Sequence, residues 1–211
     1  MKSGQIKHRP LKVSVLVNLF WHAGAGGHVK CWERLAEAAA GYPDKVCLTV
    51  HFLGNRMRII QIASNVTYKI WQPMFPSYWI PFLSHIPDHT DLAPYHFGLA
   101  KHLAGDDVIH TTEAISSFAK TAIYVSRKRE IPLVNSTHTD TSNYAQIYTA
   151  QLIERYLGHS MGARLFTETI DLPRWAARKV KHKTDRHQSE ALINLFSGLA
   201  YGEGVTDRSG V

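Results

Sequence analysis

Cysteines are scarce in this sequence, and long uncharged apolar runs are absent. Only Cys31 and Cys47 occur in 211 residues, and their spacing fits neither a disulfide framework nor a metal motif. We therefore expect both to be reduced, buried thiols of a cytoplasmic protein. The longest uncharged stretch, residues 70–84, holds three prolines and cannot form the helix of roughly 20 residues that spans a bilayer. The basic N-terminal residues precede too short an apolar run for a signal peptide, so none is expected.

Two common phosphate-binding motifs are missing as well. The glycines of "GAGGH", Gly24, Gly26 and Gly27, do not have the spacing G-x-G-x-x-G, and no acidic residue ends the second predicted strand. No Gly-Lys-Ser/Thr sequence occurs either. A dinucleotide fingerprint and a P-loop are therefore excluded. Two interpretations of the glycines stay open: a backbone cradle for a ligand oxygen at a helix start, or a tight strand-to-helix turn.

What is present is the composition of a globular protein. Apolar residues make up 45% of the chain and charged residues 19%, which allows a sizeable core. The formal charge is +7, which favours an anionic partner such as a nucleotide, a phospholipid surface or nucleic acid.

Strand and helix patterns alternate along most of the chain. The predicted strands are 13–19, 46–53, 66–71, 108–111 and 132–136, and the predicted helices are 29–39, 92–103, 116–129 and 144–157. This order predicts an α/β fold: an open parallel, Rossmann-like sheet with helices on both faces. We expect residues 1–10 to be flexible, 11–160 to form the domain, and 161–211 to be a basic helical or disordered tail.

Three polar clusters follow predicted strands: 22–28, 110–113 and 136–140. Ligands of open parallel sheets bind at the carboxyl ends of the strands, so we expect these clusters to converge. In the third cluster His138 is a candidate proton shuttle or sugar ligand, and Asp140 a candidate ligand contact. The alternative is that Asp140, Thr141 or Ser142 caps the N-terminus of the helix predicted at 144–157.

Two further segments suggest other roles. In "SHIPDHTD", His85, Asp88, His89 and Asp91 are metal-competent residues, but their spacing fits no complete metal motif. The apolar segment 71–83 is predicted to form irregular core packed over the sheet. The alternative is that it forms an apolar surface that binds an acceptor or a membrane.

In order and spacing, three segments resemble the N-terminal half of retaining GT-B glycosyltransferases, the family that includes sucrose-phosphate synthases and bacterial mannosyltransferases. They are "GAGGHVKCWERLAEA" after the first strand, then "DVIHTTEA", then "PLVNSTHTDTSNYAQIY". The resemblance covers roughly residues 11–150. It implies a close-approach glycine loop in a sugar-transfer cleft.

The resemblance also implies roles for individual residues. Gly26, Gly27 and His28 would lie at the donor diphosphate and the transferred sugar. His138 would act at the reacting sugar, and Asp140 and Tyr144 would lie near the acceptor. It implies no metal and no cofactor beyond a nucleotide-sugar co-substrate, and a sugar or lipid-linked acceptor.

The family's second, donor-binding domain has no counterpart here, because too few residues follow Tyr148 and the E-x7-E motif is absent. We therefore expect a fragment, a truncated product or one subunit of a split enzyme, completed by a partner domain or subunit.

The alternative function is a non-catalytic binding module that docks a partner chain or an anionic membrane through its basic tail. That tail includes residues 174–186, which contain six Lys and Arg residues and one acidic residue, Asp185. We expect a cytoplasmic location, with peripheral contact at the inner membrane surface left open, and no nucleic-acid partner.

Overall fold

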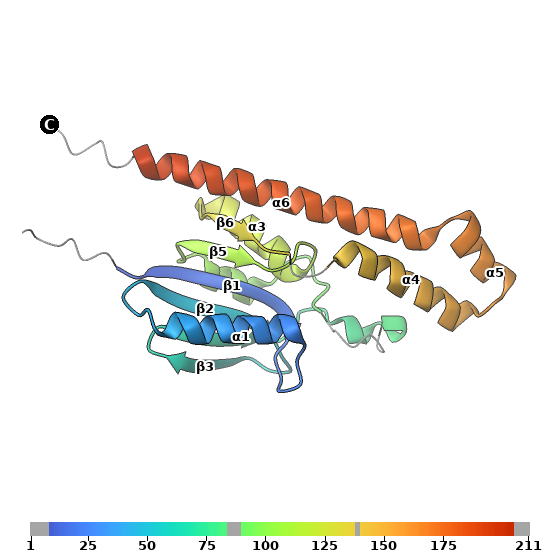
Figure 1. Ribbon diagram of the computed structural model, residues 1–211, viewed down its shortest axis with the longest axis horizontal. Coiled ribbons are helices and arrows are strands. Elements are labelled where there is room, and N and C mark those ends of the chain that lie inside the picture. Colours follow the sequence, from blue (N-terminus) through green and yellow to red (C-terminus); the bar gives the residue numbers. More distant parts are fainter. Residues whose placement is uncertain (1–8, 84–89, 138–139, 205–211) are drawn as a thin grey trace, which may run out of the picture.

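The computed structural model describes residues 9–83, 90–137 and 140–204, and a single twisted sheet lies at its centre (Figure 1). The strands are β1 (Leu11–Phe20), β2 (Val46–Leu53), β3 (Arg58–Ala63), β4 (Val66–Trp71), β5 (Val108–Thr111) and β6 (Leu133–Asn135). Their order is β3-β4-β2-β1-β5-β6. β1 pairs in parallel with β2 and β5, β2 with β4, and β5 with β6, whereas β3 is antiparallel to β4. The predicted α/β class is confirmed.

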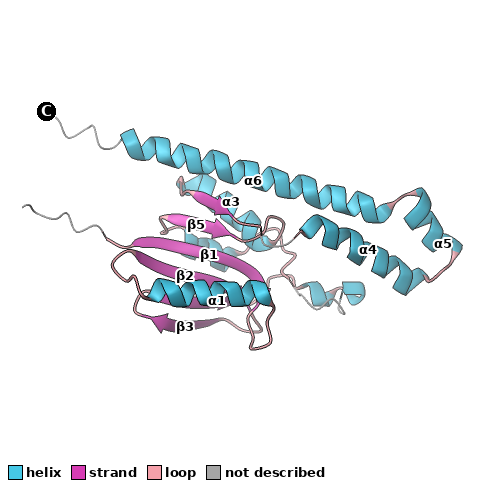
Figure 2. Cartoon of the chain, viewed as in Figure 1, coloured by secondary structure: helices cyan, strands magenta, loops and turns pink. Residues whose placement is uncertain are grey.

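Helices cover both faces of this sheet (Figure 2). They are α1 (Gly27–Ala40), α2 (Phe97–Leu103), α3 (Ser117–Arg129), α4 (Thr141–Leu157), α5 (Met161–Arg164) and α6 (Leu172–Gly204). Short 3-10 turns η1 (Ser77–Trp79) and η2 (Pro81–Leu83) follow β4, and a π-helical turn η3 (Leu165–Thr169) follows α5.

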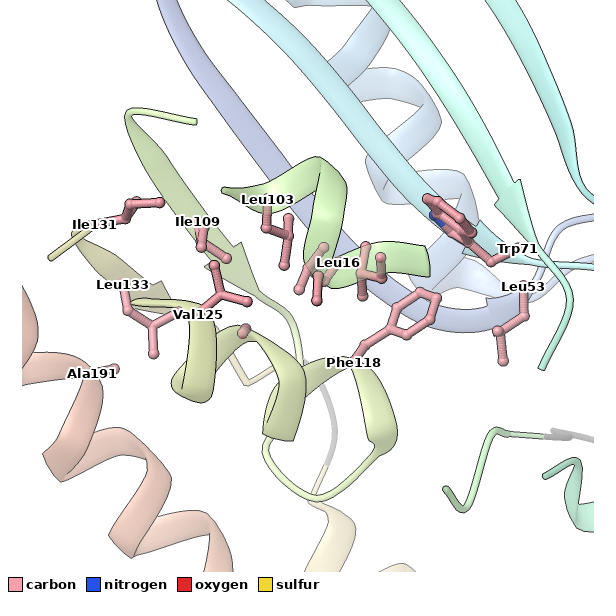
Figure 3. Packing of buried hydrophobic residues seen from close by; sticks show 13 residues of the cluster. Leu16, Leu53, Trp71, Leu103, Ile109, Phe118, Val125, Ile131, Leu133 and Ala191 are labelled. Carbon is pink, nitrogen blue, oxygen red and sulfur yellow. The ribbon is translucent and has the colours of Figure 1, made fainter. Parts of the chain in front are cut away.

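Alternation along β1 divides the core in two. Val15 and Val17 point to the face covered by α1 and pack with its Trp32. Leu16 points to the other face, toward Phe118 of α3 (Figure 3). Because both faces of the central strand are buried, β1 reads as a nearly continuous apolar run, as is typical of parallel sheets.

The long helix α6 returns to the sheet after α4 and α5 lead the chain away from it (Figure 1). Ala191 is buried in the same core cluster as Leu133 of β6 and Val125 of α3 (Figure 3). Arg127 of α3 pairs with Glu190, with 3.1 Å between the nitrogen and the carboxylate oxygen. Segment 161–211, expected as an appendage, therefore supplies part of the core.

Three elements differ from the sequence prediction. The edge strand β3 was not predicted, although three of its six residues are isoleucine, a residue typical of strands. α2 begins at Phe97 rather than at residue 92, since Pro94 disfavours helical backbone before it and Asp91 forms a bridge to Pro76. Residues 197–204, expected without regular structure, continue α6, because extending a helix costs far less than starting one.

Two burial predictions were wrong. Cys31 and Cys47 are free thiols, but both are exposed. Cys31 lies off the buried stripe of α1, and Cys47 lies at the start of β2, where the buried run begins only at Leu48.

The apolar segment after β4 is only partly core. Trp71 is buried, but four neighbouring side chains are more than a third exposed: Met74, Phe75, Tyr78 and Trp79. Two of them, Phe75 and Trp79, contact each other edge to face at 6.0 Å between ring centroids. The irregular-core interpretation therefore fails for these four. Among the helices of the described residues, none combines the length and apolar character needed to cross a membrane.

Candidate functional site: a cavity at the strand crossover

The main cavity lies where the strand order reverses. From β1 the chain moves to β2 on one side and later returns to β5 on the other, so the loops after β1 and β5 separate at their carboxyl ends. A cavity of about 540 Å³ opens there. Residues from all three predicted polar clusters line it, among them Gly26, Thr112 and Thr137. Their convergence follows from the parallel topology.

One wall of the cavity is the turn between β1 and α1. Gly26 and Gly27 line it, and a Cβ added at either would meet no described atom within 4 Å. Gly26 is extended (φ −66°, ψ 175°), and Gly158 is the one glycine of the described ranges with a positive φ. Neither the backbone nor the packing of the described residues therefore requires glycine here. A close-approaching ligand would require it.

The start of α1 adds hydrogen-bond donors to this wall. The first N–H groups of any helix lack intrahelical partners. In the described part of the chain, no side chain caps α1, and its first turn holds no acidic residue. Together with the helix dipole, such an open N-terminus favours an anion.

Asn18, near the end of β1, is the buried polar residue of this wall. Its side chain is 2% exposed, and it lines the cavity. Neither Oδ1 nor Nδ2 has a hydrogen-bond partner among the described residues. Sequence reasoning missed it, although an asparagine inside the apolar run "VSVLVNLF" is a signal, since strands are depleted in Asn.

The opposite wall carries two carboxylates, and both accept hydrogen bonds from other groups of the protein. Asp91 is fully buried and accepts hydrogen bonds from the backbone N–H groups of Met74, Phe75 and Ala93 and from the Ser117 hydroxyl. Its role is to hold the loop after β4 against α3, which leaves it little capacity for a metal.

Glu113 is similarly committed to the N-terminus of α3. Its carboxylate accepts the backbone N–H groups of Ile115 and Ser116 and a short hydrogen bond from the Ser116 hydroxyl. Ser116 in turn caps α3 by accepting from the N–H of Ala119.

Two of the predicted site residues lie at the start of α4, and one of them lines the cavity. Tyr144 lines the cavity and stacks on Tyr148, with 5.8 Å between ring centroids. Asp140 is the N-cap of α4, accepting from the N–H of Asn143 at 3.0 Å and from the Ser142 hydroxyl at 2.7 Å. These hydrogen bonds, Ser142 first, lower the pKa of Asp140. Asp140 is not among the cavity-lining residues, so the cap interpretation describes what its carboxylate does.

Some predicted residues cannot be placed. His138 lies outside the described residues, as do His85, Asp88 and His89 of the metal hypothesis. Within the ranges that the structure describes, no three His, Cys, Asp or Glu side chains gather in a metal-binding group.

α6 closes the cavity from the helical side through Val180 and Thr184. One turn further on, His187 is buried and its Nε2 lies 2.9 Å from the Thr111 hydroxyl at the end of β5. Burial lowers the pKa of His187 to about 4, although Glu190 opposes this effect. His187 is therefore neutral at pH 7 and anchors the helix that forms the wall.

Cationic and ionisable groups at the rim complete the electrostatics. His22, His28 and Lys120 line the cavity. Asp91 and Glu113, the two carboxylates of the lining, each accept several hydrogen bonds from the protein itself.

A second buried polar cluster lies away from the cavity and is internally satisfied. The Trp71 indole N–H donates to Nδ1 of the fully buried His51 at 2.8 Å, so Nε2 carries the proton and faces the Ser14 hydroxyl at 3.0 Å. Burial keeps the pKa of His51 well below its usual value. This cluster is scaffold.

No protein-family model matches this chain. No curated protein matches it significantly either.

Proposed function

We propose that this chain is the acceptor-side half of a retaining glycosyltransferase of GT-B organisation, acting with a donor-binding domain or subunit. The observation that carries the proposal is the cavity at the strand crossover, where the uncapped Gly26–Gly27 turn and Tyr144 of α4 line one space. Its volume of about 540 Å³ is in the range of small-ligand sites.

In the proposed reaction, a sugar passes from a nucleoside diphosphate to an acceptor hydroxyl with its anomeric configuration retained. The bond between the anomeric carbon and the diphosphate oxygen breaks, and negative charge grows on the leaving diphosphate. N–H donors at the start of α1 would stabilise that charge without reorganising, which is electrostatic catalysis. The acceptor proton leaves with the departing phosphate or with a base of the complete enzyme.

The two ends of the cavity suit different parts of such a reaction. The glycine turn allows a phosphate to approach the backbone, while the Tyr144–Tyr148 pair offers an aromatic surface of the kind that packs against a sugar face. The exposed edge of Tyr144 would lie on the acceptor side.

The test is thermal stabilisation of the purified chain by a panel of UDP-, GDP- and ADP-sugars. At a free ligand concentration one hundred times Kd, mass action stabilises the folded state by about 2.7 kcal/mol. A selective shift is expected for one sugar nucleotide. Gly27→Val should remove that shift while the unliganded protein keeps its melting temperature.

Gly105→Val is the matched control. Gly105 also has no described atom within 4 Å of an added Cβ, but it lies in the turn before β5 and does not line the cavity. The control should keep the ligand shift. Absence of a shift with every nucleotide sugar, or an undiminished shift for Gly27→Val, would overturn the proposal that this chain contacts the donor.

A further inference from the structure

The amide of Asn18 is placed as a ligand-binding group. It is 2% exposed, it lines the cavity, and its oxygen and nitrogen both lack partners within the described residues. Buried side-chain amides in folded proteins are normally hydrogen-bonded, because an unpaired one destabilises the fold. A partner supplied from outside the chain accounts for both unpaired atoms.

Two other polar side chains at this end of the sheet already have partners within the protein. Thr112, which follows β5 and lines the cavity, uses its hydroxyl and its N–H to contact the carbonyl of Leu16. Those contacts fix the end of β1 beside β5. Across the sheet, the amide of Asn135 is committed to the carbonyl and hydroxyl of Thr111 and to the carbonyl of Glu113.

The chemistry of the amide selects the kind of group it can bind. Oδ1 accepts one or two hydrogen bonds and Nδ2 donates two. A phosphate at neutral pH offers acceptors only, so it would leave Oδ1 unpaired. Two neighbouring hydroxyls of a sugar ring offer a donor and an acceptor together and satisfy both atoms.

We propose that Asn18 binds a vicinal hydroxyl pair of the sugar in the cavity and thereby selects the sugar's stereochemistry. This rests on the proposed function. Two parts of this wall then bind different groups of the ligand. The start of α1 binds the anionic group, and Asn18 binds the sugar hydroxyls. Selectivity of this type is strong, because a sugar lacking one hydroxyl leaves a buried amide atom unpaired.

The first measurement needs no ligand. Asn18→Leu replaces the unpaired amide with an apolar side chain of similar size and should raise the melting temperature by about 2–4 °C. Asn135→Leu is the matched control, and it should lower the melting temperature because that amide has partners. Asn18→Ala, which demands no repacking, serves as a second variant where leucine overpacks the site.

The second measurement uses two probes, pyrophosphate and a set of simple hexoses with their 2-, 3- and 4-deoxy analogues, followed by ligand-observed NMR. Asn18→Leu should weaken hexose binding at least tenfold and leave pyrophosphate binding unchanged. The two deoxy analogues that each lack one hydroxyl of the pair should show the smallest difference in affinity between the wild-type protein and Asn18→Leu, which identifies the pair.

The outcomes separate this inference from the function on which it rests. If Asn18→Leu and Asn18→Ala bind hexoses as the wild type does, or if the wild type binds pyrophosphate but no hexose, the role of Asn18 is overturned and the glycine cradle stands. A lower melting temperature for Asn18→Leu than for Asn135→Leu also overturns it. If the wild type binds neither probe, both proposals fall.

Discussion

The two walls of the cavity differ in whether their polar groups have hydrogen-bond partners within the protein. On the β1–α1 side, the helix start has no side-chain cap in the described structure, and Asn18 has no partner there. On the helical side, Ser116 and Asp140 cap their helices and Glu113 accepts several hydrogen bonds from the turn before α3.

The difference separates scaffold from binding surface. Polar groups that stabilise a fold find their partners inside it, as on the helical side. Polar groups kept for a ligand lower stability until the ligand arrives. Substitutions on the helical wall should therefore change stability, and substitutions on the β1–α1 wall should change binding while stability holds or rises.

The largest expected effect is acid destabilisation through His187. Its pKa is about 4 in the folded chain and about 6.5 when unfolded. Between these values the unfolded chain binds more protons, so stability is full above pH 6.5 and is lost as the pH falls toward 4. The loss from this residue amounts to about 3 kcal/mol.

Urea unfolding at several pH values measures it, with His187→Gln as the comparison. Glutamine keeps a donor for the Thr111 hydroxyl but does not titrate. The difference between the two curves isolates His187 from His51, whose lowered pKa acts in the same direction. Parallel curves between pH 6.5 and 4 would show that α6 is not anchored by a neutral histidine.

A middle-sized effect is expected at the cap of α3. Ser116→Ala removes the acceptor for the N–H of Ala119 and the hydroxyl that donates to Glu113. Loss of such a cap costs about 1 kcal/mol of unfolding free energy. Urea unfolding at pH 7 gives the value. A neutral result would place Ser116 with the ligand-facing groups and weaken the contrast between the walls.

The smallest effect on stability is expected at the β1–α1 wall, at the start of α1. Gly26→Ser supplies α1 with the cap it lacks in the described structure, and it should raise the unfolding free energy by a few tenths of a kcal/mol. The new hydroxyl would occupy the N–H groups that an anion needs, so pyrophosphate binding should weaken in titration calorimetry. Unchanged binding would show that the anion site lies elsewhere.

Local patterns were enough to predict five of the six strands of the sheet. The strands at 46–53 and 66–71 were predicted with the bounds that the structure shows, because each is a short β-branched run ended by glycine or proline. The convergence of three polar loops followed from parallel topology. β3, the antiparallel edge strand paired with β4, was missed although its three isoleucines are typical strand residues.

Packing between segments far apart in the sequence could not be predicted from local patterns. The return of α6 to the sheet depends on Ala191 and His187, neither of which stands out beside the basic residues of that segment. The lack of hydrogen-bond partners for the Asn18 amide among the described residues is visible only in the folded structure. The exposed thiols of Cys31 and Cys47 show that residue type alone does not decide burial.

The position of α6 in the chain has a consequence for how the cavity forms during synthesis. Chains fold from the N-terminus as they leave the ribosome. The sheet and the glycine turn are complete by residue 135, but Val180, Thr184 and His187 emerge only later. A nascent chain therefore exposes the crossover before α6 packs beside it, and a chaperone has access to this end of the sheet during that interval.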